Sequence, residues 1–298
     1  MLAVDHPFPN MDFRDMDNDN SWRIFAWVWE RKDEIWGKMQ QLYDWFRNRR
    51  NDDEERPDIL IIGPGGVGKT TLGGFLAQKF DFFTHPPGEY QESLGVETFD
   101  LVRGSEQTPV AGLVIPPGQE HRRPSNWNDL FRELTEGKFR GVILLSAWGY
   151  HSLGNISYKK HHLFDRTKPQ FLESYLSDRR NDEISVLKQL APHLMACSRK
   201  LWVMSLIAKQ DLWWTKKEEV RKHYEEGEYG AELRKILSHR GNQQFRHEFV
   251  FASLVIGNFV TGMKELLQPN TAGFDHHLCV QSLRRMFETF DSLRNWEA

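Results

Sequence analysis

The sequence has little cysteine and no long apolar run. Only two cysteines occur, Cys197 and Cys279, far apart and without the spacing of a metal site. This scarcity suits a reducing compartment, and we expect a cytoplasmic protein. No apolar run reaches the roughly eighteen residues that a membrane span needs, so the sequence predicts no transmembrane segment. The acidic N-terminus does not have the pattern of a secretory signal.

An excess of charge of one sign is also lacking. Lys and Arg number 39 and Asp and Glu number 42, which gives a formal net charge of −3. Binding to a phosphate backbone depends on a marked excess of basic side chains, so the composition favours no nucleic-acid partner. The 298 residues, 39% of them hydrophobic, are enough for one large α/β domain with additional elements.

Tryptophan, by contrast, is abundant near the N-terminus. The chain has eleven tryptophans, and five of them lie in residues 22–45. After a polar acidic arm, residues 1–20, which we expect to be disordered, four aromatic residues recur every seven positions: Trp22, Trp29, Trp36 and Tyr43. This spacing predicts an amphipathic helix over residues 21–50.

The predicted helix 21–50 has three interpretations. It packs on its own domain, it binds a protein partner or a second copy of the chain, or it lies on a membrane surface. Its charged residues are mixed in sign rather than basic, which counts against a lipid surface. We expect a protein partner or self-association at this helix and no peripheral membrane contact.

Residues 58–77 carry the strongest functional signal. The apolar run 59–62 predicts a buried parallel strand, and the apolar spacing of residues 71–77 predicts a helix. Between them, the chain matches the phosphate-binding pattern G-x-x-x-x-G-K-[ST] at every position. The residues that we expect to surround the phosphates are Gly63, Gly65, Gly66, Val67, Gly68, Lys69, Thr70 and Thr71.

The composition of this loop follows from its chemistry. Glycines allow backbone N–H groups to curl round a phosphate, and the N-terminus of the following helix adds positive potential. Lys69 is expected to reach the β- and γ-phosphates, and the Thr70 hydroxyl is expected to bind Mg²⁺. The loop therefore predicts a nucleoside triphosphate as the ligand.

Apolar runs and helical patterns alternate along the rest of the chain. Strands are predicted at 96–102, 108–115, 141–147, 200–207 and 249–255, the first two as a hairpin. Helices are predicted at 128–135, 183–198, 215–238 and 274–293. This order predicts an α/β fold, a P-loop NTPase three-layer sandwich with a mostly parallel sheet and its ligand at the carboxyl ends of the strands. The domain is expected to cover residues 57–298, with an insertion at about 149–182.

Four further short motifs stand beside predicted strands. They are Ser93-Leu94-Gly95-Val96-Glu97, Val114-Ile115-Pro116-Pro117-Gly118-Gln119-Glu120, Ala208-Lys209-Gln210-Asp211 and Phe251-Ala252-Ser253-Leu254. In this order they resemble switch I (T-I-G-V-D), switch II (W-D-T-A-G-Q-E), the guanine motif (N-K-x-D) and the S-A-K loop of the Ras and Rab type of small GTPases. The resemblance covers roughly residues 57–293.

The resemblance implies a role for each matching residue. Ser93 would bind Mg²⁺ and sense the γ-phosphate, the amide of Gly118 would meet the γ-phosphate, and Gln119 would orient the attacking water. Lys209, Asp211 and Ser253 would surround the guanine base. A carboxylate such as that of Asp211 accepts from guanine N1–H and the exocyclic amine, a bidentate pair that adenine cannot form.

Some positions depart from the family pattern. Ile115 stands where the family has the aspartate that holds Mg²⁺ through water, and Ala208 replaces the asparagine of the guanine motif. The S-A-K loop keeps only Ser253. Arg122 and Arg123 follow switch II, and we expect them on a solvated face rather than at the γ-phosphate.

Three functions are compatible with this pattern. The first is a GTP-binding switch that holds GTP with Mg²⁺, hydrolyses it slowly with Lys69 and Gln119, and signals to a protein partner through the switch regions and the N-terminal helix. The second is a pseudo-GTPase that serves as a binding or scaffold module. The third is an ATP-using P-loop NTPase. The run GGVGKTT also resembles the ParA/MinD-type ATPases, but these carry a signature lysine where this chain has Pro64.

Overall fold

The computed structural model describes residues 58–77, 93–103 and 108–296. The predicted acidic arm 1–20 and the predicted amphipathic helix 21–50 lie outside the described residues. The hypothesis that this helix binds a partner therefore stays a prediction.

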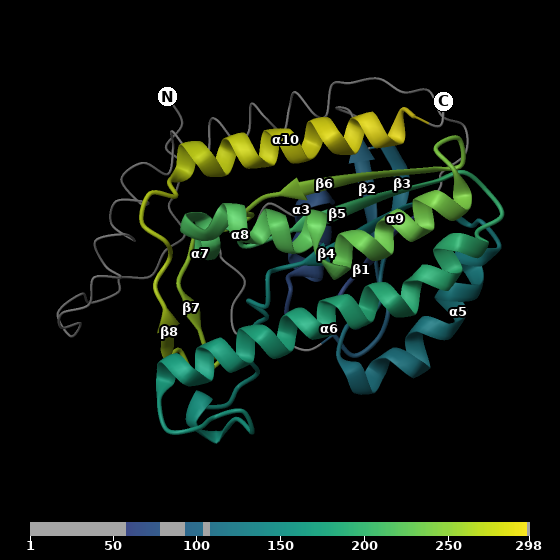
Figure 1. Cartoon of the computed structure of the whole chain (residues 1–298). Coiled ribbons are helices and arrows are strands. Elements are labelled where there is room, and N and C mark those ends of the chain that lie inside the picture. The colour runs from purple at the N-terminus through teal and green to yellow at the C-terminus, as the bar shows by residue number, and fades with distance from the viewer. Residues whose placement is uncertain (1–57, 78–92, 104–107, 297–298) are drawn as a thin grey trace, which may run out of the picture. The chain divides into compact units, whose positions relative to one another are not determined.

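A six-stranded sheet forms the centre of the described chain, in the order β2-β3-β1-β4-β5-β6 (Figure 1). Its strands are β1 (Asp58–Ile62), β2 (Glu97–Arg103), β3 (Thr108–Ile115), β4 (Phe139–Ser146), β5 (Leu201–Ile207) and β6 (Phe245–Phe251). Strand β2 runs antiparallel to β3, and all other neighbouring strands are parallel. The central strands are apolar and buried because helices cover both faces. The predicted α/β fold is confirmed.

Helices form the two outer layers (Figure 1). On one side of the sheet lie α3 (Lys69–Leu76) and α10 (His276–Arg294), joined by stacking of Phe75 on Phe287 at 5.5 Å. On the other side lie α5 (Arg123–Thr135), α6 (Lys168–Ala196) and α9 (Glu228–Arg240), where Phe131 of α5 stacks on His193 of α6 at 4.6 Å. The hydrophobic core thus lies on both faces of the sheet.

Shorter elements connect these layers. They are η2 (Glu120–Arg122), η3 (Tyr158–Lys160), α7 (Gln210–Trp213), η4 (Trp214–Lys216), α8 (Lys217–Arg221), the π-helical turn η5 (Lys222–Glu226), and the two-stranded pair β7 (Phe259–Val260) and β8 (Leu266–Gln268). The region 215–238, predicted as one charged helical stretch, is divided among three of them (η4, α8 and η5) and α9. Gly227, whose backbone is extended, separates η5 from α9.

Helix α6 differs most from the prediction. It begins at Lys168 rather than at Glu183, so the second half of the predicted insertion 149–182 is regular helix. The side chain of Thr167 accepts a hydrogen bond from the backbone N–H of Gln170, and a proline stands in the first turn, which is the usual start of a helix. Phe171 and Tyr175 are buried on the inner face of this segment.

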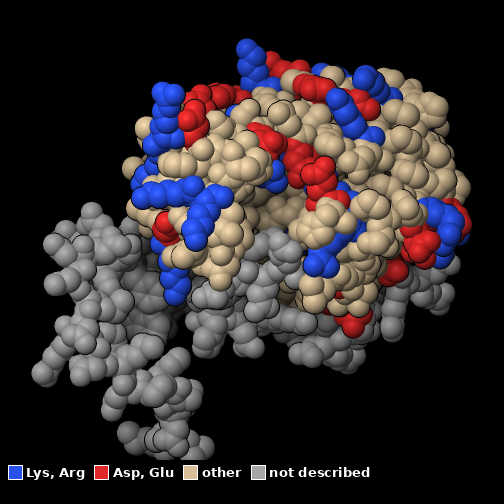
Figure 2. Space-filling view, turned by 90° about the horizontal axis from the view of Figure 1, so that it is seen from below, with Lys and Arg blue, Asp and Glu red and all other residues tan. Residues whose placement is uncertain are grey.

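We also expected no nucleic-acid partner and no transmembrane segment, and the surface and the helices of the described chain relate to these two expectations. On the face drawn in Figure 2, Lys and Arg side chains are interspersed with Asp and Glu side chains and form no continuous basic area. Among the described residues, no helix is both long enough and apolar enough to cross a membrane.

One edge of the sheet collects the segments that the sequence singles out. The carboxyl ends of β1, β3, β4, β5 and β6 all point to this edge because these strands are parallel. Strand β2 runs the opposite way, so it enters the sheet there, at Glu97. The loops that follow the five parallel strands therefore meet in one place.

Candidate functional site

The phosphate-loop motif forms the connection between β1 and α3. Gly66 and Gly68 have φ of +77° and +105°, a conformation that residues with a side chain rarely adopt. A Cβ atom on Gly66 would also lie 2.7 Å from the backbone nitrogen of Ser152, which follows β4. The Ser152 N–H donates to the Gly66 carbonyl at 2.9 Å. The loop is thus closed tightly against the end of the neighbouring strand.

Lys69 is folded back into this loop. Its Nζ donates to the carbonyl oxygens of Gly63 at 3.0 Å and Pro64 at 2.8 Å, and the side chain is buried. Burial and then the positive charge of Arg123 lower the pKa of Lys69 to about 7. An ammonium group in this position is stabilised by a neighbouring anion, which is the property that a phosphate-binding lysine needs.

The predicted switch II residues lie directly beside the loop. A Cβ atom on Gly118 would come within 2.3 Å of Lys69 Nζ and 2.4 Å of the Gly63 carbonyl oxygen, so only glycine fits there. The Cγ atom of Gln119 lies 3.3 Å from the position that a Cβ on Gly65 would take. The end of β3 therefore brings Gly118 and Gln119 to the phosphate loop, as the resemblance implies.

The predicted metal ligands also come together. Thr70 Oγ1 lies 3.4 Å from Ser93 Oγ, and it donates to Glu97 Oε2 at 2.9 Å. Two hydroxyls and one carboxylate are hard oxygen donors of the kind that Mg²⁺ prefers, so these residues fit that ion. Glu97 was not predicted as a site residue. Ile115, by contrast, is 1% exposed and points toward Gly73 of α3.

Arg123 corrects an expectation. We expected it on a solvated face, but it is 4% exposed and pairs with Asp182 of α6 at 2.7 and 2.8 Å. Its Nε donates to the Gly118 carbonyl at 3.0 Å, while Arg122 donates to the Leu94 carbonyl at 3.4 Å. Arg123 thus holds the backbone at Gly118, because its guanidinium lies between this carbonyl and the Asp182 carboxylate.

At the other end of the site, Asp211 and Ser253 form a buried pair. The Ser253 hydroxyl donates to Asp211 Oδ1, and the backbone N–H of Gly257 donates to Oδ2 at 3.0 Å. Asp211 is 2% exposed, and burial raises its pKa despite these hydrogen bonds. Two residues far apart in sequence, both predicted to surround the base, are therefore in direct contact.

Lys209 connects the two ends. Its Nζ donates to the Gly66 carbonyl of the phosphate loop at 3.1 Å and to the Tyr150 carbonyl at 2.5 Å, and Ser152 Oγ lies 3.4 Å away. Burial lowers the pKa of Lys209 to about 8. The loop after β5 is thereby tied to the phosphate loop and to the loop after β4.

The loop after β5 lacks the asparagine of the family pattern. The carbonyl of Ala208 instead accepts a hydrogen bond from Trp213 Nε1 at 2.9 Å, and its N–H donates to the Ser146 carbonyl at 2.7 Å. Trp213 is buried and packs edge-on against Phe251 at 6.0 Å. The indole of Trp213 thus stabilises this turn through a hydrogen bond to the backbone of Ala208.

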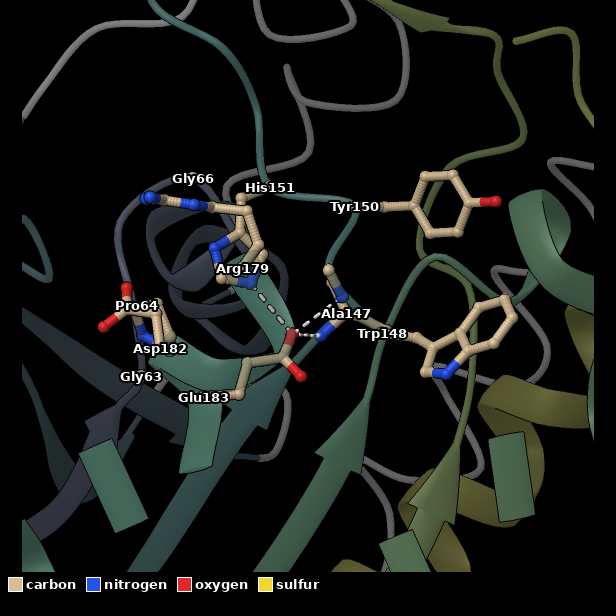
Figure 3. Close-up of polar contacts among 12 residues, drawn as sticks. Gly63, Pro64, Gly66, Ala147, Trp148, Tyr150, His151, Arg179, Asp182 and Glu183 are labelled. Atoms are coloured by element: carbon tan, nitrogen blue, oxygen red, sulfur yellow. Dashed lines mark hydrogen bonds and ion pairs between the residues drawn. The ribbon is translucent and has the colours of Figure 1, made fainter. Parts of the chain in front are cut away.

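A buried polar network supports the loop after β4 from α6 (Figure 3). Glu183 Oε1 accepts hydrogen bonds from the backbone of Ala147 at 2.8 Å and Gly149 at 3.1 Å, and lies 2.8 Å from His151 Nε2. The Tyr224 hydroxyl donates to Oε2 at 2.5 Å. Burial acts to raise the pKa of Glu183, but the hydrogen bond and charge of His151 and the Tyr224 hydroxyl lower it overall. The carboxylate therefore stays ionised.

Several of these residues escaped the sequence analysis. Glu183 and His151 are far apart in the chain and match no motif. Glu97 stands within the stretch that resembles switch I, but the resemblance implies no role for its side chain. Tyr150 and Ser152 act mainly through backbone groups, for which the sequence carries no signal. The available signal was positional, since residues 147–152 follow a fully apolar strand at the edge of the sheet where the carboxyl ends of the parallel strands lie.

Comparison with known proteins gives a structural likeness only. No protein-family model matches the chain, and no curated protein sequence matches it. The signal recognition particle receptor subunit with GDP from Chaetomium thermophilum is 17% identical, with a TM-score of 0.37 over 69% of this chain and 92% of that one. The mammalian signal recognition particle receptor is 15% identical, with a TM-score of 0.35 over 78% and 98%.

A third structure is the small COPII coat GTPase of Encephalitozoon cuniculi in complex with GDP. It is 11% identical, with a TM-score of 0.38 over 93% of this chain and 98% of that one. Values this low say nothing about what the chain binds. Its own strand order and its phosphate loop between β1 and α3 define a small-GTPase-like α/β fold of the P-loop type.

Proposed function

We propose that the chain is a GTP-binding switch protein that binds GTP with Mg²⁺ and hydrolyses it slowly. The observation that carries this proposal is the contact of Lys209 Nζ with the Gly66 carbonyl at 3.1 Å. It joins the phosphate loop to the Asp211 and Ser253 pair, so the two ends of a nucleoside triphosphate site lie on one connected framework. An accidental glycine-rich turn gives no reason for this connection.

Each residue has a specific task in this proposal. Lys69 exchanges its contacts with the Gly63 and Pro64 carbonyls for the β- and γ-phosphates, and Thr70 and Ser93 hold the metal by their hydroxyl oxygens. Gln119 orients a water beside Gly65. When bound, Mg²⁺ neutralises negative charge on the transferred phosphoryl group. Gly118 offers its N–H to the γ-phosphate, and because it has no side chain it can lie directly against Lys69 and the Gly63 carbonyl.

A pseudo-GTPase is the second candidate, and two observations favour it. Ile115 is a buried apolar residue where a metal-supporting aspartate would stand, and Asp211 already accepts hydrogen bonds on both oxygens. In that case the chain binds nucleotide as a structural module. A protein partner at the predicted helix 21–50 and at the switch regions is part of the proposal in both cases.

The base preference provides the first test. We expect GTP to bind about 5- to 150-fold more tightly than ATP, because a bidentate base contact discriminates by about 1–3 kcal/mol. Asp211→Ala should bring the two affinities within about 3-fold of each other. Ser253→Ala is the matched variant, because it removes one donor to Asp211 and keeps the carboxylate. Both ratios are measured by competition with a fluorescent nucleotide.

The outcomes separate the candidates. A smaller change for Ser253→Ala than for Asp211→Ala supports guanine recognition by the carboxylate. Equal affinity of the unmutated chain for GTP and ATP contradicts it. A melting curve for each variant shows whether it is folded, since loss of a buried carboxylate leaves the Gly257 N–H without its acceptor.

The rate of hydrolysis provides the second test. Single-turnover measurements should give a rate on the order of 10⁻⁴ to 10⁻³ s⁻¹ without a partner, because positioning of the water is incomplete in an unassisted small GTPase. Gln119→Ala should lower this rate and leave GTP affinity unchanged, whereas His121→Ala, an exposed neighbour, should change neither. Turnover near 1 s⁻¹ contradicts the proposal. Tight GTP binding with no hydrolysis supports the pseudo-GTPase.

A further inference from the structure

Glu97 is the first residue of β2 and lies at the edge of the sheet where the carboxyl ends of the parallel strands meet. It is half-buried, and its Oε2 accepts a hydrogen bond from Thr70 Oγ1 at 2.9 Å. Ser93 Oγ lies 3.4 Å from the same Thr70 atom. Three oxygen-bearing side chains from two separate segments therefore converge at the first turn of α3.

The strand register relates Glu97 to Ile115. In the antiparallel pair of β2 and β3, Glu97 stands directly opposite Ile115. Residues opposite each other in such a pair project to the same face of the sheet. Ile115 and Phe99 both point toward Gly73 of α3, and Glu97 reaches Thr70 one turn earlier on the same helix. The carboxylate is thus adjacent to the position from which the family's aspartate is missing.

The charge of Glu97 also acts on the phosphate end of the site. It is one of the two carboxylates whose charge raises the pKa of Lys69, against burial and Arg123. Next to phosphates, a negative charge at this place repels the ligand unless a cation lies between them.

We propose that Glu97 supplies the carboxylate that supports Mg²⁺ at this site, in place of an acidic residue at position 115. This inference rests on the proposed function. Thr70 can donate its proton to Glu97 and still offer a lone pair to the metal, and Ser93 offers a second hydroxyl oxygen. The carboxylate thereby orients the Thr70 hydroxyl and accepts from water on the metal, since Mg²⁺ usually keeps several waters.

The experiment uses the full chain and a non-hydrolysable GTP analogue with a fluorescent group. Its affinity is measured in EDTA and over a series of Mg²⁺ concentrations for the unmutated chain, Glu97→Gln and Glu97→Asp. The matched control is Asp100→Asn, which removes one negative charge from an exposed position of the same strand. Binding of Mn²⁺ to the protein–nucleotide complex, measured by electron paramagnetic resonance, reports the metal directly.

Opposite effects with and without metal are the expected result. Glu97→Gln should raise the half-saturating Mg²⁺ concentration about 10-fold, within the usual range of coupling between two ligands. In EDTA the same variant should bind the analogue more tightly, because a repelling charge is gone. Glu97→Asp should fall between the unmutated chain and Glu97→Gln, and Asp100→Asn should match the unmutated chain.

Two other results overturn the inference in different ways. If Glu97→Gln has the same Mg²⁺ dependence as the unmutated chain, or weakens binding equally in EDTA and Mg²⁺, Glu97 has only a structural role and the proposed function stands. If the unmutated chain binds no nucleotide at any Mg²⁺ concentration, the proposed function and this inference fail together.

Discussion

Replacing Lys69 by alanine is expected to raise the dissociation constant for GTP about 10³-fold, because charge-assisted hydrogen bonds contribute about 1.5–3 kcal/mol each and two are lost. The structure explains why no neighbour can substitute for it. Lys69 Nζ is already inside the loop, on the carbonyls of Gly63 and Pro64. Arg123, which is also near, is held by Asp182 and the Gly118 carbonyl.

The measurement is a titration with a fluorescent GTP analogue. Lys235→Ala is the matched control, since it removes an exposed lysine from α9. Lys69→Ala should melt at a temperature close to that of the unmutated chain in the absence of nucleotide, because a buried amine with a lowered pKa contributes little to stability. Retention of GTP affinity within about 10-fold would show that the loop does not bind phosphate through this lysine.

The strands could be predicted from the sequence with small errors, because buried parallel strands are continuous apolar runs. Residues 59–62, 141–147 and 200–207 correspond closely to β1, β4 and β5. Strand β6 was predicted at 249–255 but runs from Phe245 to Phe251. It lies at the edge of the sheet, where Arg246 and Glu248 stay half-buried, so its first half carries no apolar run.

The start of α6 could not be read from apolar periodicity, because residues 168–182 contain many charged side chains. The local signal was Thr167 followed by Pro169, a helix cap and a residue suited to the first turn. The buried face of the helix is provided by a few aromatic residues, such as Phe171 and Tyr175, spaced one turn apart.

Within the site, the residues of recognisable motifs could be predicted from the sequence, and the residues that support them could not. Lys69 was predicted from the phosphate-loop pattern, and Gly118 and Asp211 were predicted from the resemblance to the small GTPases. Their supports were not, since Arg123 and Glu183 depend on partners that only tertiary packing supplies. In the sequence, a carboxylate in a polar helix cannot be distinguished from a solvent-exposed one. Only the fold shows that Glu183 is buried next to the end of β4.

The supporting network around Glu183 leads to the second large effect. Glu183→Ala is expected to lower the free energy of unfolding by about 3–5 kcal/mol, as does removal of one member of a buried ionic group. The backbone N–H groups of Ala147 and Gly149 and the Tyr224 hydroxyl would lose their acceptor. Glu183→Gln should cost less, because the amide oxygen still accepts two of these bonds. Urea denaturation followed by tryptophan fluorescence measures both.

Glu173→Ala is the matched control, because it removes an exposed carboxylate from the same helix and should change stability by no more than about 0.5 kcal/mol.

Two pKa shifts also predict sensitivity to acid. Burial lowers the pKa of His151 below 6.5, so the unfolded chain binds an extra proton below that value and stability falls as the pH decreases. The lowered pKa of Glu183 adds a further loss below 4.5.

The same network reaches the candidate site, which gives the prediction a second readout. Glu183 fixes Ala147 and Gly149, and the chain that follows them carries Ser152, whose N–H holds the Gly66 carbonyl. Loosening this segment should weaken GTP binding even where Glu183→Ala is fully folded, whereas Glu173→Ala should leave GTP affinity unchanged. If Glu183→Ala lowers stability by less than about 1 kcal/mol, the carboxylate is not the centre of this network.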